Sequence, residues 1–199
     1  QLFCSAANTT SGVVNGLTIG QTYFVRVYSN ANTPQTTTFN LCISTPASCI
    51  SGQAACQNLS YQNTTGVANQ GTIGCLGSSP NPAYYTINVA TSGPINLLLT
   101  QSTTQGGTPN LDVDYAAWGP FTNQAAACAA IGNPPTLAPG IGVPVTLQTG
   151  CSFSAAPTEN LNIANAVAGQ VYVILITNFS NQPGFISLTQ TNAGSQGAG

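Results

Sequence analysis

The three acidic residues are the first candidates for chemistry in this sequence. In 199 residues they are Asp112, Asp114 and Glu159, and the single Lys or Arg is Arg26. Asp112 and Asp114 stand two residues apart in a β-type stretch, so their side chains share one face of a strand. Carboxylates completed by backbone carbonyls and Asn amides suit Ca²⁺. We expect these acids to bind a structural Ca²⁺; the alternative is that they accept backbone N–H groups at turns and strand ends.

Other residue types argue against an enzyme. A carboxylate pair could serve a glycosidase, but only one Trp is present to line a sugar cleft. A Ser or Cys nucleophile usually relies on His or Lys as its base, and the sequence has neither. We therefore predict a protein without catalytic residues.

The near absence of charge limits the possible partners. Charged residues make up 2% of the chain, against about 25% in an average protein. Binding of nucleic acid or an anionic membrane surface needs several Lys or Arg residues, and no apolar stretch approaches the roughly 20 residues of a membrane span. We expect neither partner. Low charge also removes the repulsion between copies that keeps proteins monomeric, which favours self-assembly.

Three aromatic residues are candidates for ligand binding. Trp118 precedes Gly119-Pro120, and Tyr84 and Tyr85 are adjacent. Together with a Ca²⁺ site, these rings could stack on a surface polysaccharide. The alternative for Trp118 is a place in the core, where it would cover a disulfide.

Seven cysteines indicate an oxidising compartment. They show no metal-type spacing and there is no His, so structural disulfides explain them better than zinc does. Sequence alone leaves the pairing open, since six cysteines allow 15 pairings. We favour Cys128–Cys151 and, next, Cys56–Cys75. The chain begins at Gln1, and we expect a processed, exported protein of the cell exterior or cell surface.

Short β-type stretches alternate with Gly, Pro, Asn and Ser throughout, as in an antiparallel β-sandwich or jelly roll. A short helix is expected only at 123–131. The expected strands are 22–29, 37–44, 84–90, 95–101, 111–118, 171–178 and 185–190, with weaker candidates at 13–19, 145–147 and 161–163.

A linker-like stretch divides the chain. We expect a partial β-sandwich at 1–46, a complete sandwich at 47–192 and a flexible tail at 193–199. The first unit is short for an independent core, and its missing strands would come from an upstream segment or from a neighbouring subunit. In strand 22–29, Tyr23 and Val25 should face inward. N-glycosylation sequons begin at Asn8, Asn58, Asn63 and Asn178.

Several blocks resemble a known module. GCLGSSPNPAYY at 74–85, DVDYAAWGPF at 112–121 and TENLNIANAVAGQVYVILITNFSNQP at 158–183 are similar to a β-sandwich module of large Bacteroidota surface proteins exported by the type IX secretion system. Residues 16–46 resemble part of a pre-peptidase-C-like β-sandwich that often precedes it. The resemblance implies a module without known catalytic activity, found in adhesins, gliding-associated proteins and filaments, and it supports a cation at the acids.

These observations lead to one functional hypothesis and one rival. The first is a non-enzymatic extracellular subunit of a filament or surface adhesin, assembled by β-strand contacts with other copies or with neighbouring domains of the same long chain. The rival is a Ca²⁺-dependent polysaccharide-binding module that uses Trp118, Tyr84 and Tyr85.

Overall fold

The structure is a computed structural model that describes residues 21–26, 33, 48–55, 58–63, 65–141 and 150–195. The chain divides into two compact units, Gln1–Ser44 and Thr45–Gly199. Each unit is considered by itself. The strands expected at 13–19, 37–44 and 145–147 lie outside the described residues.

In the first unit, residues 21–26 have no regular secondary structure. The described part of the expected strand 22–29 is therefore not a strand. Phe24 is 95% exposed and Val25 59% exposed, so the expected inward position of Val25 is wrong. The physical reason is that high β-propensity produces a strand only where a neighbour pairs its backbone and packs its side chains.

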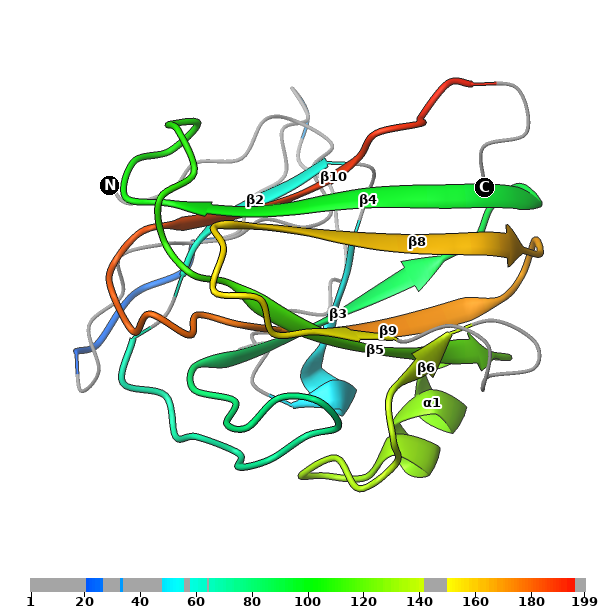
Figure 1. The fold of residues 1–199 in the computed structure, drawn as a ribbon, viewed down its shortest axis with the longest axis horizontal. Helices are drawn as coiled ribbons and strands as arrows, with labels where there is room; N and C mark the ends of the chain where they lie inside the picture. The colour runs from blue at the N-terminus through cyan, green and yellow to red at the C-terminus, as the bar shows by residue number, and fades with distance from the viewer. Residues whose placement is uncertain are drawn as a thin grey trace. The chain divides into compact units, whose positions relative to one another are not determined.

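The second unit is a β-sandwich with two layers (Figure 1). In the described residues, sheet A has the strand order β1-β3-β9-β5-β6, with β7 also pairing with β5, and sheet B has the order β2-β10-β4-β8. Most pairings are antiparallel, and β1–β3 and β5–β6 are parallel. The strands are β1 (Gln53–Ala54), β2 (Asn58–Gln62), β3 (Pro82–Asn88), β4 (Gly93–Ser102), β5 (Asp114–Phe121), β6 (Gly140–Ile141), β7 (Cys151–Ser152), β8 (Thr158–Ala166), β9 (Val171–Thr177) and β10 (Phe185–Gln190).

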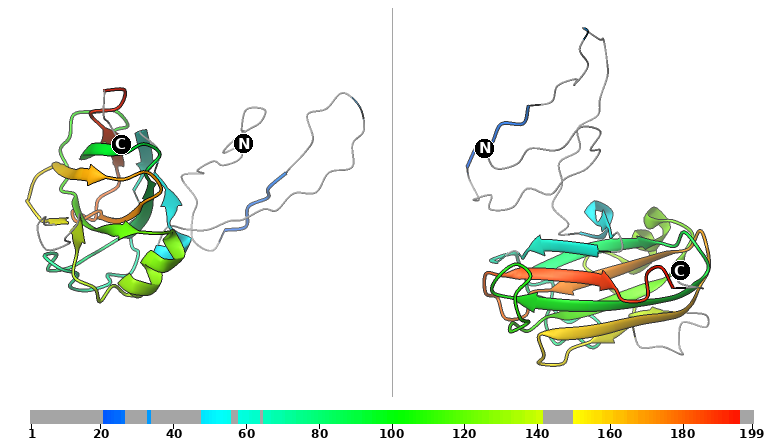
Figure 2. Two further views of the ribbon diagram at one scale, coloured as in Figure 1. Left: turned by 90° about the vertical axis from the view of Figure 1, so that its right-hand side faces the viewer. Right: turned by 90° about the horizontal axis from the view of Figure 1, so that it is seen from above.

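Side-chain patterns explain the layers. β9 is apolar at nearly every position and is buried along its whole length, because it is central in sheet A and covered on both faces. β8 alternates between buried and exposed residues, because only one of its faces meets the core. The right-hand view of Figure 2 shows sheet B as neighbouring strands, with gold β8 at one edge.

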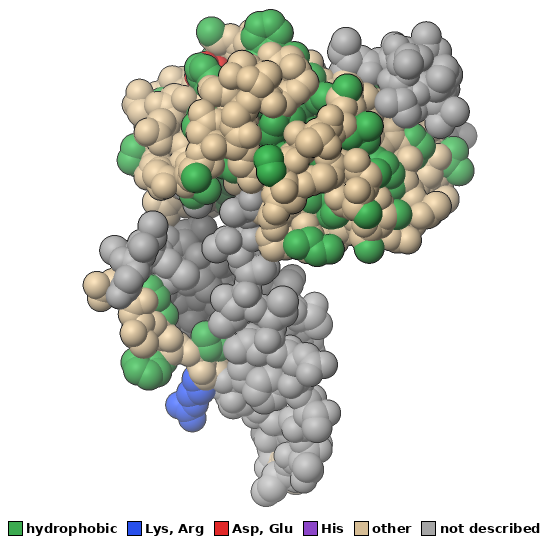
Figure 3. All heavy atoms as spheres, turned by 90° about the horizontal axis from the view of Figure 1, so that it is seen from below, with side chains coloured by type: hydrophobic (Ala, Val, Ile, Leu, Met, Phe, Trp, Pro, Cys, Tyr) green, Lys and Arg blue, Asp and Glu red, His purple; other side chains and the backbone are tan. Residues whose placement is uncertain are grey.

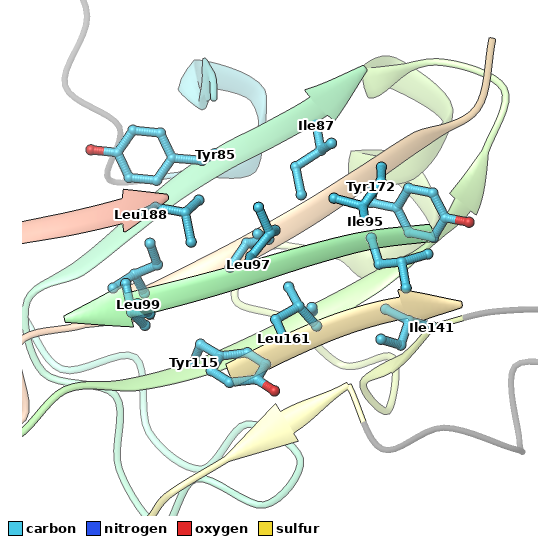
Figure 4. Packing of buried hydrophobic residues seen from close by; sticks show 14 of the residues in the cluster. Tyr85, Ile87, Ile95, Leu97, Leu99, Tyr115, Ile141, Leu161, Tyr172 and Leu188 are labelled. Carbon is cyan, nitrogen blue, oxygen red and sulfur yellow. The ribbon is translucent and has the colours of Figure 1, made fainter. Parts of the chain in front are cut away.

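Apolar side chains form two clusters, one on each face of sheet A. The cluster between the sheets includes Tyr85, Leu99, Tyr115, Leu161 and Tyr172 (Figure 4). The second cluster includes Trp118 and Val173 and lies under the 3₁₀ helix η1 (Cys49–Ser51) and helix α1 (Gln124–Ile131).

Helix α1 confirms the short helix expected at 123–131. Its N-cap is Asn123, whose side-chain oxygen accepts a hydrogen bond from the Ala126 amide at 2.8 Å. The all-β sandwich class is likewise confirmed.

Candidate functional site

The acidic residues lie near strand ends of both sheets, at one end of the sandwich. Asp114 begins β5 and lies opposite Thr177 at the end of β9. Glu159 is the second residue of β8 in the other sheet, opposite Leu99 of β4. Asp112 precedes β5, and its backbone oxygen accepts a hydrogen bond from the Ser180 amide at 3.5 Å. The fold thus brings all three acids from distant parts of the chain into one region.

The other two carboxylates act electrostatically on Asp114. Burial, followed by the charges of Asp112 and Glu159, raises the pKa of Asp114 from 3.8 to about 7. Burial also raises the pKa of Asp112, against a hydrogen bond from the Val113 backbone that lowers it. The Oδ1 atoms of Asp112 and Asp114 are buried and have no hydrogen-bond partner among the described residues. Near neutral pH, part of the population therefore carries a proton on Asp114.

Glu159 is held by serines. Its Oε2 accepts a hydrogen bond from Ser152 Oγ at 2.6 Å, and its Oε1 accepts one from the Ser154 amide at 3.2 Å. The same carboxylate and burial raise the pKa of Tyr115 to about 12, with burial the larger cause. Glu159 therefore links β8 to β7 and to the segment that follows β7. This is the structural role considered as the alternative to metal binding.

Binding of Ca²⁺ by Asp112, Asp114 and Glu159 stays a prediction. No group of three or more His, Cys, Asp or Glu side chains in the described part of the chain is placed to hold a metal ion. Glu159 accepts hydrogen bonds from Ser152 and Ser154, and Asp114 lies opposite Thr177 in the register of β5 and β9. The buried Oδ1 atoms of Asp112 and Asp114 have no hydrogen-bond partner among the described residues. Carboxylate oxygens of this kind are suitable ligands for a hard cation such as Ca²⁺.

Beside the acids lies a network of buried amides that sequence reasoning missed. Gln101 Nε2 donates to Asn178 Oδ1 at 2.7 Å, and Asn178 Nδ2 donates to the Gln182 carbonyl at 3.1 Å. Asn63 Nδ2 donates to the same carbonyl at 3.0 Å. Neutral side chains thus satisfy buried polar groups in a chain that has almost no charges. The sequence signal was the clustering of Asn and Gln at strand ends.

This network also bears on two sequons. Asn63 is 8% exposed and Asn178 1% exposed, and the amide nitrogen of each already donates a hydrogen bond to Gln182. Neither nitrogen is accessible for glycosylation in the folded chain. Asn8 lies outside the described residues.

The three candidate ligand-binding aromatics belong to the core. Trp118 is 1% exposed, Tyr84 1% and Tyr85 2%. Trp118 Nε1 donates to the Leu137 carbonyl at 2.9 Å, and Tyr84 OH donates to Gln70 Oε1 at 2.5 Å. The expectation of a sugar-stacking platform at these residues is therefore wrong. Their strands, β3 and β5, lie inside sheet A, and both faces of that sheet are covered.

Among the described residues of the second unit, two disulfides are present, with pairings other than those expected. Cys49 of η1 is bonded to Cys128 of α1, and Cys75 is bonded to Cys151 of β7. Cys128 therefore does not pair with Cys151, nor Cys75 with Cys56. The reason is spatial: η1 and α1 cover the same face of sheet A, which places Cys49 next to α1. Cys56 lies outside the described residues, as do Cys4 and Cys42.

The surface is largely neutral. Figure 3 shows mostly uncharged atoms on the face drawn, with one group of blue atoms, which belong to the chain's single cation. Among the described residues, Phe24 has the most exposed large apolar side chain, at 95%, followed by Ile50 at 71% and Phe153 at 65%. None of the helices in the described segments is long and apolar enough to cross a membrane.

Comparisons with known proteins add little to this geometry. No family model matches the chain, and no curated protein matches it. Among solved structures, the chain is similar to the pre-peptidase C-terminal domain of collagenase from Bacillus anthracis. The identity is 11%, the TM-score is 0.37, and the match covers 69% of this chain and 91% of that domain. At this level of similarity we draw no functional conclusion from it.

Proposed function

We propose that this chain is a non-enzymatic, extracellular structural subunit of a filament or surface adhesin, and that its units hold together through contacts between β-strands. The observation that carries the proposal is segment 21–26, which combines a strand-forming sequence with the 95% exposed ring of Phe24. The neighbouring side chains of Tyr23 and Val25 are also exposed, at 39% and 59%, and contiguous exposed apolar surface marks interaction sites. The partner is another copy or a neighbouring domain of the same long chain.

Charge supports the same proposal. Copies of most proteins repel one another through net charge, whereas this chain has a formal net charge of −2 from only four charged residues. Of the three acids, Asp114 and Glu159 are buried. The surface therefore offers little electrostatic opposition to close contact between copies.

The extracellular location rests on the cysteines. The disulfides Cys49–Cys128 and Cys75–Cys151 stabilise the second unit, and bonds of this kind persist in oxidising compartments. We further propose that the protein is exported by a type IX secretion system. We also propose that it belongs to the adhesin modules that its sequence blocks resemble.

One observation supports a bound cation. The buried Oδ1 atoms of Asp112 and Asp114 lack partners among the described residues, and carboxylate oxygen is the ligand that Ca²⁺ prefers. A structural Ca²⁺ at these two residues stays a prediction. If Ca²⁺ binds there, the melting temperature of the chain at pH 8 should be higher with added Ca²⁺ than with EDTA. A polysaccharide-binding role has less support, because Tyr84, Tyr85 and Trp118 are buried.

Assembly is tested with the purified full chain. Sedimentation velocity and negative-stain microscopy over a wide concentration range should detect linear assemblies of the wild type. Phe24→Ser should remain monomeric. Phe153→Ser, which removes a 65% exposed ring from the second unit, is the matched control and should assemble as the wild type does. A wild-type chain that stays monomeric at the highest soluble concentration would refute the proposed function.

A further inference from the structure

Near the end of the sandwich that carries the acids, buried side-chain oxygens lack hydrogen-bond partners among the described residues. They are Asp112 Oδ1, Asp114 Oδ1, Thr177 Oγ1 and Gln101 Oε1. Buried polar atoms are nearly always paired, so an unpaired one needs an explanation, and a bound ion is one such explanation. Thr177 and Gln101 are fully buried, and Asp114 is 3% exposed. These oxygens are therefore candidate ligands for a cation.

Two of these oxygens lie on the same face of sheet A. Asp114 of β5 and Thr177 of β9 are directly opposite each other in the antiparallel register, and Figure 1 shows the two strands as neighbours. Opposed residues of paired strands carry their side chains on one face. Two residues further along, Ala116 lies opposite Leu175, and both belong to the cluster under η1 and α1. The side chains of Asp114 and Thr177 therefore point to this outer face, which is turned away from sheet B.

Asp112 adds a third oxygen from the segment before β5. Val113 belongs to the cluster between the sheets, so the residues on either side of it, Asp112 and Asp114, share the outer face. The charge of Asp112 is also one of the causes that raise the pKa of Asp114, after burial, as expected for two carboxyl groups that lie close together. Asp112, Asp114 and Thr177 therefore form one group of buried oxygens.

Two nearby residues do not belong to this group. Gln101 follows Leu99 by two positions on β4, and the Leu99 side chain lies between the sheets. The Gln101 side chain therefore points into that layer as well. Both carboxylate oxygens of Glu159 already accept hydrogen bonds, from Ser152 Oγ and from the Ser154 amide.

The chemistry of the three oxygens suits Ca²⁺. Two neighbouring buried carboxylates repel each other, and a divalent cation between them removes that cost. The Thr177 hydroxyl donates to no described acceptor although a carboxylate stands opposite it, and it is a neutral oxygen ligand. Ca²⁺ accepts irregular sets of oxygens at about 2.3–2.6 Å, whereas Mg²⁺ requires near-ideal octahedral geometry and keeps several of its waters. Three buried ligands from two strands therefore favour Ca²⁺ over Mg²⁺.

We propose that Asp112, Asp114 and Thr177 bind one Ca²⁺ on the outer face of sheet A, with the Thr177 hydroxyl as the neutral ligand. This inference rests on the cation prediction made under the proposed function, and it adds the third ligand, the face of the sheet and the selectivity. The ion links the start of β5 to the end of β9. Asp112 is only half-buried, so the ion has access from its side.

Calorimetric titration with Ca²⁺ alone tests the third ligand. The full chain is treated with EDTA, desalted and titrated at pH 8, and the wild type should bind one ion per chain. Thr177→Val keeps the β-branched shape but removes the hydroxyl, and it should weaken binding by about tenfold or more. Thr177→Ser retains a hydroxyl and should bind nearly as tightly as the wild type.

Three controls accompany this titration. Thr100→Val is the matched variant, because it makes the same change at a half-buried threonine of β4 in sheet B. It should bind Ca²⁺ as the wild type does. Asp112→Asn and Asp114→Asn should each weaken binding at least as much as Thr177→Val. An equal concentration of Mg²⁺ should not displace bound Ca²⁺.

Melting temperatures distinguish a ligand from a merely structural threonine. In EDTA, Thr177→Val should be at least as stable as the wild type, because it removes a buried hydroxyl that has no described partner. With saturating Ca²⁺ the wild type should be the more stable of the two. A threonine with only a structural role would give the same difference in both conditions.

The inference is overturned if Thr177→Val binds Ca²⁺ as tightly as the wild type, if Thr100→Val weakens binding equally, or if Mg²⁺ displaces the ion. Binding that depends on Asp112 and Asp114 but not on Thr177 leaves the predicted cation in place and removes only the third ligand. A wild type that binds no Ca²⁺ refutes both. Self-assembly of the wild type in EDTA is measured separately, so the proposed filament or adhesin role stands or falls independently.

Discussion

The buried carboxylate of Asp114 makes the stability of the second unit depend on pH. Asp114 is 3% exposed, its Oδ1 atom has no partner among the described residues, and its pKa is raised from 3.8 to about 7. A raised pKa means that the folded chain binds more protons than the unfolded chain between these two values. The free energy of unfolding should therefore fall as the pH rises from about 4 to about 7, and then level off.

The size of this effect follows from the shift. A change from 3.8 to about 7 corresponds to roughly 4 kcal/mol at about 1.4 kcal/mol per pKa unit. Asp114 begins its strand at an end of the sandwich, where water and local relaxation screen part of the cost. We therefore expect a loss of about 2 kcal/mol between pH 4 and pH 8.

Replacement by the neutral isostere provides the test. Asp114→Asn should raise the free energy of unfolding at pH 8 by about 2 kcal/mol and should flatten the pH profile. Glu159→Gln also removes one negative charge, but it weakens acceptance from Ser152 and Ser154. At pH 8 we expect a net loss of stability from that change, by about 1 kcal/mol.

The assay is urea denaturation of the full chain with intact disulfides, measured at half-unit pH intervals from 4 to 9. A free energy of unfolding that is constant or rises with pH between 5 and 7 would refute the reasoning. So would an Asp114→Asn profile with the same slope as the wild type.

Three further predictions concern the rest of the second unit. Removing the disulfide in Cys75→Ser/Cys151→Ser, which closes a loop with a sequence separation of 76, should lower the free energy of unfolding by about 4 kcal/mol in urea titrations. Trp118→Ala should cost about 4 kcal/mol, because a fully buried indole is lost, while retention on polysaccharide affinity gels should not change. Expressed in a eukaryotic secretion host, the chain should carry no glycan at Asn63 or Asn178 by mass spectrometry of its peptides, because both amide nitrogens are buried and donate to the Gln182 carbonyl.

Much of the second unit could be predicted from its sequence. The continuous apolar run of β9 indicated a strand covered on both faces, and β10 begins and ends where the pattern predicted. Helix α1 followed from its run of Ala after a capping Asn. These elements are specified locally, by the residues that they contain.

Other elements depend on distant neighbours and were missed or shortened. β8 was expected only at 161–163 but spans Thr158–Ala166, because the outward positions of an edge strand can be polar and weaken the apolar signal. β2 was missed for the same reason. β1, β6 and β7 have two residues each and exist only through pairing with long strands.

In the candidate site, too, some features follow from the local sequence and others depend on distant residues. The spacing of Asp112 and Asp114 correctly indicated two carboxylates close together, but the serines that hold Glu159 come from another strand and its loop. Disulfide pairing was not predictable because it depends on η1 and α1 lying together on sheet A. Burial of Trp118 was one of two alternatives, and the layer that covers sheet A decided between them.

Cryo-electron microscopy of filaments grown from the purified full chain tests the central claim most directly. The account predicts that residues 21–26 of each subunit contact an adjacent copy, with the ring of Phe24 buried in that contact. Filaments in which the Phe24 ring faces solvent would contradict it.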